Sequence, residues 1–225
     1  MDRPIRLMTA NLLAGRADLM HLSMVLDRVE PDIFVTQELG HDAAEEIGAH
    51  FPYHDLRPND DARGRGIASR LDADFGEIPL PWRPGLWAQV SDGPPFLVAT
   101  IHMGNPIVFP WWRSVRIRSQ QLEALFAWAD ESAKGRAPFI LAGDMNASPA
   151  WPIYKQLADR WDDLVARYAD ESGEAAAPTW AWRPRWPRLL RIDHVFGTGA
   201  RVVSAGVEPM RGSDHAAVVV DLLFD

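Results

Sequence analysis

The stretch at residues 139–149, FILAGDMNASP, constrains the fold most. Four apolar residues end abruptly at Gly143, and so short a run between turn formers is typical of a buried strand. Asp144 and Asn146 follow with one residue between them. In an extended chain this spacing points both side chains to the same face. The stretch therefore predicts either a turn that closes the strand or a polar site at its mouth.

Apolar runs and amphipathic segments alternate along the rest of the chain. Residues 18–30 have apolar side chains at helical spacing, and Pro31 ends that helix. Strands are expected at 5–12, 32–38, 66–70, 86–90, 96–102, 139–142, 191–196, 201–208 and 216–224. Helices are expected at 18–30, 42–50, 116–132 and 151–157. Irregular chain is expected at 57–65 and 170–187. This alternation predicts a layered α/β fold. There is no repeat and no low-complexity linker, so we expect a single domain over residues 1–225.

Composition excludes several classes of protein. The 225 residues are 47% hydrophobic and contain no cysteine, so disulfides, zinc–thiolate sites, iron–sulfur clusters and cysteine nucleophiles are ruled out. The net charge of −8 argues against a general nucleic-acid coat protein, although a local basic rim could still meet phosphates. No apolar run approaches the ~18–20 residues of a membrane span and no signal peptide is seen, so we expect a cytoplasmic protein. No obligate protein partner is evident.

Polar residues stand where the apolar strands begin or end. These positions are Asn11, Glu38, His102, Asp144 with Asn146, Asp193, and the pair Asp214–His215 before the last strand. In layered α/β folds such groups converge on one rim, where ligands bind. So many positions of one chemical type are hard to assign to capping alone. Carboxylate and amide oxygens suit Mg²⁺ or Mn²⁺, and histidines beside such an ion suit acid–base work at a phosphoryl group.

Seven motifs then carry a resemblance to a known family. In chain order they are TANLLAG (9–15), QEL (37–39), RGIASR (65–70), IHMG (101–104), GDMNASP (143–149), RIDHVF (191–196) and GSDHAAVVVDL (212–222). The series resembles the endonuclease/exonuclease/phosphatase superfamily, the DNase I-like metal phosphoesterases. The resemblance implies a four-layered α/β sandwich, with two mainly antiparallel sheets packed face to face and helices outside. It also implies Mg²⁺-dependent hydrolysis of a phosphoester, with Mn²⁺ as a possible substitute.

The resemblance further implies roles for the residues at the strand ends. Glu38 would be the principal metal ligand, with Asn11 helping to hold the metal or its waters and Asp214 close by. Asp144 would orient or deprotonate the attacking water, or protonate the leaving group. Asn146 would hold the scissile phosphate.

The same resemblance assigns the histidines. His215 would be the general base or a phosphate contact, and Asp193 would hydrogen-bond it and fix its tautomer. His102 would contact the non-bridging phosphate oxygens, where charge accumulates in the transition state. His194 has no clear role, and we expect a packed, hydrogen-bonded histidine. Asn105 either reaches the site or forms a turn before Pro106.

Two aromatic-rich segments, 106–118 and 179–191, adjoin these positions and should line the same rim. From them we expect substrate contacts by Trp112, Trp180, Trp182 and Arg183. Bases of a single strand could stack there, or the segment could sit in the headgroup layer of a membrane, or the tryptophans could only pack the loop onto the domain. The leading function is a phosphodiesterase, nuclease-like or acting on a phospholipid headgroup. The alternatives are a phosphomonoesterase acting on a sugar or inositol phosphate, and a catalytically silent binding module.

Overall fold

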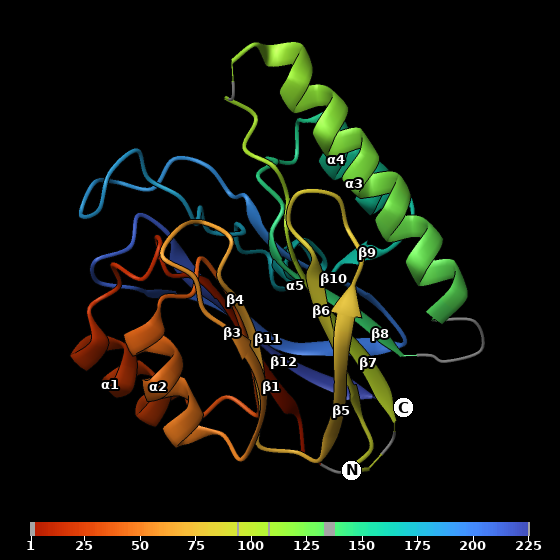
Figure 1. Cartoon of the computed structure of the whole chain (residues 1–225). Helices are drawn as coiled ribbons and strands as arrows, with labels where there is room; N and C mark the ends of the chain where they lie inside the picture. The colour runs from red at the N-terminus through yellow and green to blue at the C-terminus, as the bar shows by residue number, and fades with distance from the viewer. Residues whose placement is uncertain (1–2, 94, 108, 133–137, 225) are drawn as a thin grey trace.

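Two six-stranded sheets pack against each other, with helices on both outer sides (Figure 1). The computed structural model describes residues 3–93, 95–107, 109–132 and 138–224. The first sheet has the order β11 (Ala200–Pro209), β12 (Ala216–Phe224), β1 (Ile5–Asn11), β2 (Ile33–Gln37), β4 (Arg65–Ser69) and β3 (Tyr53–Arg57). The second has the order β5 (Ala73–Ile78), β6 (Gly85–Val90), β7 (Phe96–His102), β8 (Phe139–Asp144), β10 (Asp193–Thr198) and β9 (Asp162–Asp163). Most neighbouring strands are antiparallel, whereas β1–β2 and β7–β8 are parallel. The predicted α/β sandwich is confirmed.

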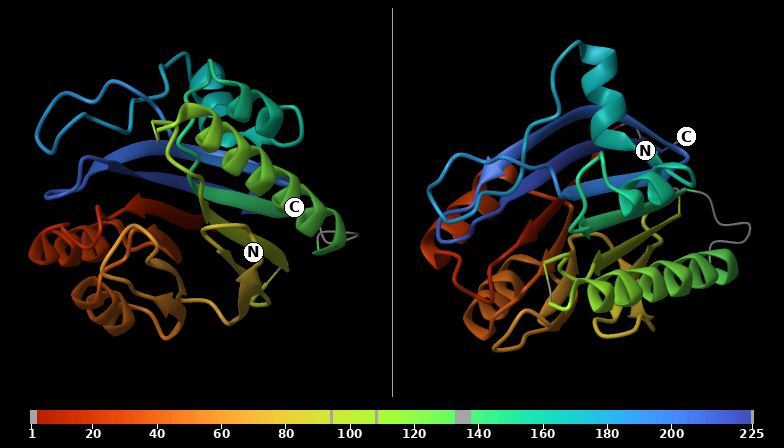
Figure 2. Two further views of the ribbon diagram at one scale, coloured as in Figure 1. Left: turned by 45° about the horizontal axis from the view of Figure 1, so that its top comes forward. Right: turned by 90° about the horizontal axis from the view of Figure 1, so that it is seen from above.

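Successive side chains along each strand point to opposite faces of the sheet, and this divides the core into layers. In β7, Phe96 and Val98 belong to the cluster between the sheets, whereas Leu97 and Ala99 face the outer helices. The helices α3 (Trp111–Ser132) and α4 (Pro152–Ala158) cover the outer face of the second sheet. The helices α1 (Leu19–Val29) and α2 (His41–His50) cover the first. Figure 2 shows these layers from two further directions.

Several elements differ from the sequence-based expectations. Helix α3 begins at Trp111 rather than at residue 116, because Pro110 is tolerated just before a helix start, so part of the expected 106–118 loop is helical. The edge strands β3 and β5 were missed because they are largely half-exposed and lack a clean apolar alternation. Helix α5 (Leu164–Ser172) was also missed, and it enters the segment expected to be irregular from residue 170.

The longest described helix, α3, has 22 residues and exposes arginines along its first turns. No helix in the described ranges is long and apolar enough to cross a membrane. The cytoplasmic location and the single-domain organisation stay predictions.

Candidate active site

Pairing between neighbouring strands brings the polar strand ends to one edge of the two sheets. His102 at the end of β7 and Asp193 at the start of β10 both lie opposite Asp144 at the end of β8. The antiparallel direction of β10 explains why its first residue meets the last residue of β8. A pocket of about 270 Å³ opens at this edge. Its lining includes Glu38, His102, Asp144, Asn146, Asp214 and His215.

Backbone geometry at the edge is specialised. Gly143 has φ +145°, and a Cβ there would collide with the carbonyl oxygen of Ile101 on β7. Only glycine therefore lets β8 run this close to β7 just before Asp144. Glu38 and Asn146 have φ of 55° and 46°, left-handed values that L-residues with side chains rarely adopt. Such strain concentrates at functional sites, where it aims a side chain.

Asp144 lies at the centre of the site and is 1% exposed. Its carboxylate accepts hydrogen bonds from Asn11 Nδ2 at 3.0 Å and from the Asn146 backbone N–H at 2.8 Å. His102 Nε2 lies 3.4 Å from Asp144 Oδ2. Burial, followed by repulsion from Asp193, raises the pKa of Asp144 to about 7. A carboxyl with such a pKa can hold or release a proton near neutrality.

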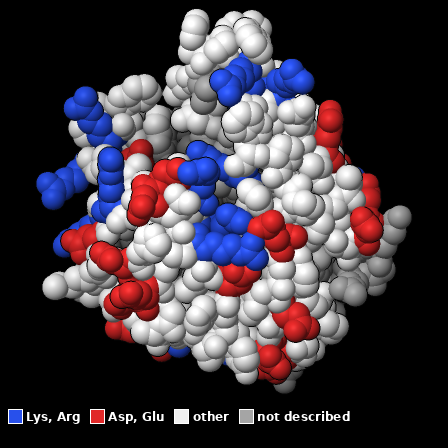
Figure 3. Space-filling model, viewed as in Figure 1, with Lys and Arg blue, Asp and Glu red and all other residues white. Residues whose placement is uncertain are grey.

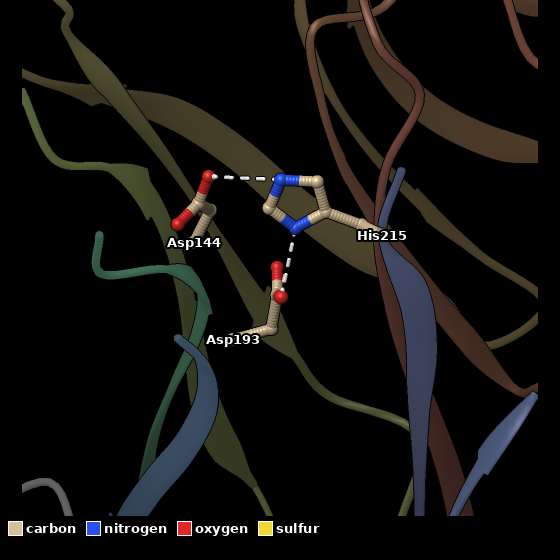
Figure 4. A group of neighbouring side chains, drawn as sticks. All are labelled: Asp144, Asp193 and His215. Atoms are coloured by element: carbon tan, nitrogen blue, oxygen red, sulfur yellow. Dashed lines mark hydrogen bonds and ion pairs between the residues drawn. The ribbon is translucent and has the colours of Figure 1, made fainter. Parts of the chain in front are cut away.

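His215 and Asp193 form a buried pair beside it (Figure 4). His215 Nδ1 lies 2.8 Å from Asp193 Oδ2, and its Nε2 points toward Asp144 Oδ2 at 3.9 Å. Burial alone lowers the pKa of His215. The charge of Asp193 and its hydrogen bond more than offset this effect, and the pKa rises to about 10. This contact with Asp193 holds the ring in place and favours the imidazolium.

His102 has the opposite electrostatics. Burial and the positive charges of Arg83 and His215 hold the pKa of His102 well below its ordinary value, so its ring is neutral. Arg83 Nη1 donates to His102 Nε2 at 2.7 Å, which leaves the ring proton on Nδ1. The site therefore holds one charged and one neutral imidazole. A phosphate contact through His102 Nε2 would require Arg83 to move or to share that contact.

The donor set fits a hard divalent cation. Within the described residues, Asp193 Oδ1 and Asp214 Oδ1 are buried oxygens without a hydrogen-bond donor. Together with Glu38 and Asp144 they supply the oxygen ligands that Mg²⁺ and Mn²⁺ prefer. One ligand atom each of Asp144, Asp193 and His215 lie within 4.8 Å of one another. Because Asp193 already binds the imidazole, Glu38, Asp144 and Asp214 are the residues that would hold such a cation.

The orientation of the Asn11 amide refines its expected role. Its Oδ1 accepts from the Leu13 backbone N–H at 2.9 Å, and its Nδ2 donates to Asp144 and, at 3.3 Å, to Glu38 Oε1. The reverse orientation would point an oxygen at two carboxylates. Asn11 thus holds the two carboxylates in place, and its expected role toward a metal or its waters stays a prediction.

Comparison with known proteins now gives the family. A model described as "Endonuclease/Exonuclease/phosphatase family" matches residues 8–215. The chain belongs to this family. No curated protein matches the sequence. Because the members of this family are metal-dependent hydrolases of phosphoester bonds, membership makes the chain an enzyme of this family.

Several solved structures are similar to this chain over almost its whole length. The catalytic domain of human Nocturnin is 21% identical, with a TM-score of 0.77, and 99% of this chain and 95% of that one are covered. The 3′ phosphatase NExo from Neisseria, bound to a product DNA hairpin, is 20% identical with a TM-score of 0.77, covering 98% and 99%. An AP endonuclease from Archaeoglobus fulgidus is 19% identical with a TM-score of 0.74, covering 98% and 99%. At these identities the likeness establishes the fold.

This family member also uses residues that sequence reasoning missed. Arg83 lines the pocket from the β5–β6 connection, where no motif marks it. Gln37 donates to Thr9 on one sheet and to Thr100 on the other, and so ties the sheets together beneath the site. Arg118 donates to the Asn146 carbonyl oxygen at 2.8 Å. Its position near the start of an apolar-faced helix gave no signal for this contact.

His194 is confirmed as a buried, hydrogen-bonded residue. Its Nε2 donates to the Ala147 carbonyl oxygen at 2.8 Å, and its Nδ1 faces Asp163 and Arg191. Asp163 also accepts from Tyr154 and caps α5. This network braces the chain just after Asn146 from behind.

Both aromatic segments line the pocket, as expected. Pro106 and Ile107 come from the first, with Asn105 just before it, and Trp180 and Leu190 come from the second. Asn105 Oδ1 accepts from the Ile107 N–H, so it also forms the predicted turn.

The expected substrate contacts divide into two groups. Trp180 lies in the pocket wall and donates to Asp214 at 3.2 Å. Trp182 packs edge-on against Trp180, with 5.8 Å between the ring centroids. The pocket lining does not include Trp182, Arg183 or Trp112. Their substrate role stays a prediction.

Proposed function

We propose that this protein hydrolyses a phosphodiester by attack of water on phosphorus, with Mg²⁺ or Mn²⁺ as its cofactor. One observation carries the proposal. Within the pocket, the buried carboxyl group of Asp144 has a pKa near neutrality. It lies beside other carboxylates and beside the imidazolium of His215. Nucleophile activation and charge stabilisation of a phosphoryl group need these two kinds of group side by side.

Glu38, Asp144 and Asp214 would hold the cation. When bound, it would polarise a phosphoryl oxygen and lower the pKa of bound water. A buried oxygen of Asp214 without a hydrogen-bond donor supports this assignment, because a cation would satisfy it.

The residues of the chain perform the other steps. Asp144 orients the attacking water and can accept its proton, and Asn146 fixes the phosphate beside it. His215, held by Asp193, faces the phosphoryl oxygens as a cation. Arg83, which also lines the pocket, adds a second positive charge.

A phosphomonoester is the second candidate substrate. The Neisseria protein that resembles this chain is described as a 3′ phosphatase, and it was solved with a product DNA hairpin. The pocket reaches solvent, so it does not by its shape exclude a substrate with one ester bond.

A paired chromogenic assay tests the proposal. Bis(p-nitrophenyl) phosphate and p-nitrophenyl phosphate are offered with Mg²⁺, with Mn²⁺ and with EDTA. We expect metal-dependent turnover, faster on the diester, and a loss of about 10²-fold or more for Asp144→Asn or Glu38→Gln. Glu45→Gln on exposed α2 is the matched control and should behave as wild type. Metal-independent turnover, or a fully active Asp144→Asn variant, would refute the mechanism.

A further inference from the structure

Exposed large apolar side chains concentrate around the pocket mouth. Nine of the 13 such side chains among the described residues lie on three segments, and we call these nine the apolar rim. They are Trp82, Ile107, Phe109, Trp111, Trp112, Val115, Trp182, Trp186 and Leu189. Phe109 is 89% exposed and Trp111 69%. Soluble proteins seldom expose apolar residues in such a cluster unless the surface binds something.

Each of the three segments of the apolar rim reaches the pocket. Ile107 itself lines the pocket, Trp82 adjoins the lining residue Arg83, and Leu189 adjoins the lining residue Leu190. In Figure 1 the start of α3 projects at the top of the molecule, far from both chain ends. A partner bound to the rim would therefore cover the mouth of the pocket.

Arginines lie among these apolar side chains. Arg113 stacks over Trp82 at 5.3 Å, and Arg183 over Trp186 at 5.6 Å. Arg183, Arg185 and Arg188 line a second depression, of about 780 Å³, which shares Asp214 with the pocket. Figure 3 shows the projecting top as mostly uncharged, with Lys or Arg just beneath it and at the upper left. Among the described residues, these four arginines form no ion pair, whereas Arg6, for example, pairs with Asp221. The positive charge of the rim is therefore left for a partner.

The composition of the rim discriminates between partners. A single nucleic-acid strand would stack bases on the tryptophans and place phosphates on the arginines. It would leave the aliphatic Ile107, Val115 and Leu189 in water. The headgroup layer of a bilayer accepts all three kinds of side chain, because aromatic and aliphatic groups enter the acyl boundary while arginines meet lipid phosphates.

We infer that the apolar rim docks on the surface of an anionic phospholipid bilayer and presents a phospholipid headgroup to the pocket. The inference rests on the proposed function for its chemistry. Water adds to phosphorus, one P–O ester bond breaks, and the leaving oxygen takes the proton that water gave up. The products are an alcohol and a phosphomonoester. Since the whole chain carries a charge of −8, the local arginines must supply the electrostatic attraction, and added salt should weaken docking.

Vesicle co-sedimentation tests the docking. The intact chain with Asp144→Asn, kept in EDTA, is mixed with vesicles of phosphatidylcholine and phosphatidylglycerol, so that turnover cannot influence the result. We expect binding that falls at least about tenfold in Phe109→Ser/Trp111→Ser. The matched control is Met20→Ser/Met24→Ser, which removes two exposed apolar side chains from α1, 77% and 59% exposed, and should bind as before. Thermal unfolding checks that each variant is folded, and Trp186→Ser repeats the test on the other loop.

The outcomes separate this inference from the proposed function. Absence of vesicle binding, or equal binding by the rim variants, overturns the inference even when bis(p-nitrophenyl) phosphate is still cleaved. Tight binding of a single-stranded oligonucleotide that the rim variants lose, without vesicle binding, also overturns it. Rim-dependent vesicle binding without hydrolysis of any diester supports docking and refutes the proposed function. Rim-dependent binding together with release of a headgroup phosphoester from the vesicles supports both.

Discussion

Gly143→Ala is the sharpest test of how the fold positions the site. The new Cβ would collide with the Ile101 carbonyl oxygen of β7 and lie 3.1 Å from Gln37 Nε2. The residue would also have to keep φ +145°, where alanine is strained. The backbone strain alone costs about 1–3 kcal/mol. Relief requires β8 to move away from β7, which weakens ladder hydrogen bonds worth about 1 kcal/mol each.

The expected loss is therefore about 3 kcal/mol in the free energy of unfolding. For a chain of this length this corresponds to a fall in Tm of roughly 6–12 °C. Because Asp144 is the next residue, any movement of β8 displaces the catalytic carboxylate. Turnover should fall about 10²-fold in the population that stays folded.

Urea unfolding followed by tryptophan fluorescence measures the first effect, and turnover well below the new Tm measures the second. Gly206→Ala in β11 is the matched control, since nothing lies within 4 Å of a Cβ there and its φ is not left-handed. That variant should be neutral, or more stable by up to about 1 kcal/mol. If Gly143→Ala unfolded within about 0.5 kcal/mol of wild type, a range typical of surface substitutions, the close-approach argument would be wrong.

Three further predictions address other parts of the site and fold. Asp193→Asn should return the pKa of His215 toward its ordinary value and lower turnover about 10²-fold or more, as NMR titration and kinetics would show; an unchanged titration would contradict the pairing. Asp163→Ala should cost about 3–5 kcal/mol in urea unfolding, because it leaves buried cationic and polar partners unpaired; a loss below 1 kcal/mol would argue against the network. Arg6 holds the pKa of Asp221 below its ordinary value, so the pair stabilises the fold above the unfolded pKa of ~3.9 and loses this contribution as pH falls through the lower folded pKa. Asp221→Asn should therefore lower stability at neutral pH by about 1 kcal/mol or less, and this difference should shrink in acid.

Much of the site could be predicted because its polar residues stand at the ends of apolar strands. Glu38, Asp144 and Asp193 are charged groups beside buried apolar strands, and such groups need a specific partner. Their convergence follows from strand pairing, which any layered α/β fold would produce. The sequence alone could not assign which of them face a metal, because side-chain direction at a left-handed residue such as Glu38 depends on local geometry.

Other features depend on contacts between distant segments. Arg83 comes from a short connection rich in proline, and the pairing of β5 with β6 and of β6 with β7 brings it to His102. The edge strands β3 and β5 are partly exposed on both faces, so their pattern has no period to detect. Helix α5 did carry local signals, since Asp163 caps its start and Gly173 ends it.

The pairing of β1 with β12 has a consequence for synthesis of the protein. Residues 5–9 pair with residues 218–222, and His215 directly precedes the strand that makes this contact. During translation β1 must wait for β12, at residues 216–224, to leave the ribosome before its sheet is complete. The nascent chain thus stays catalytically silent until β12 has emerged, and a premature stop that removes β12 would yield an inactive protein with an open central strand edge, prone to aggregation.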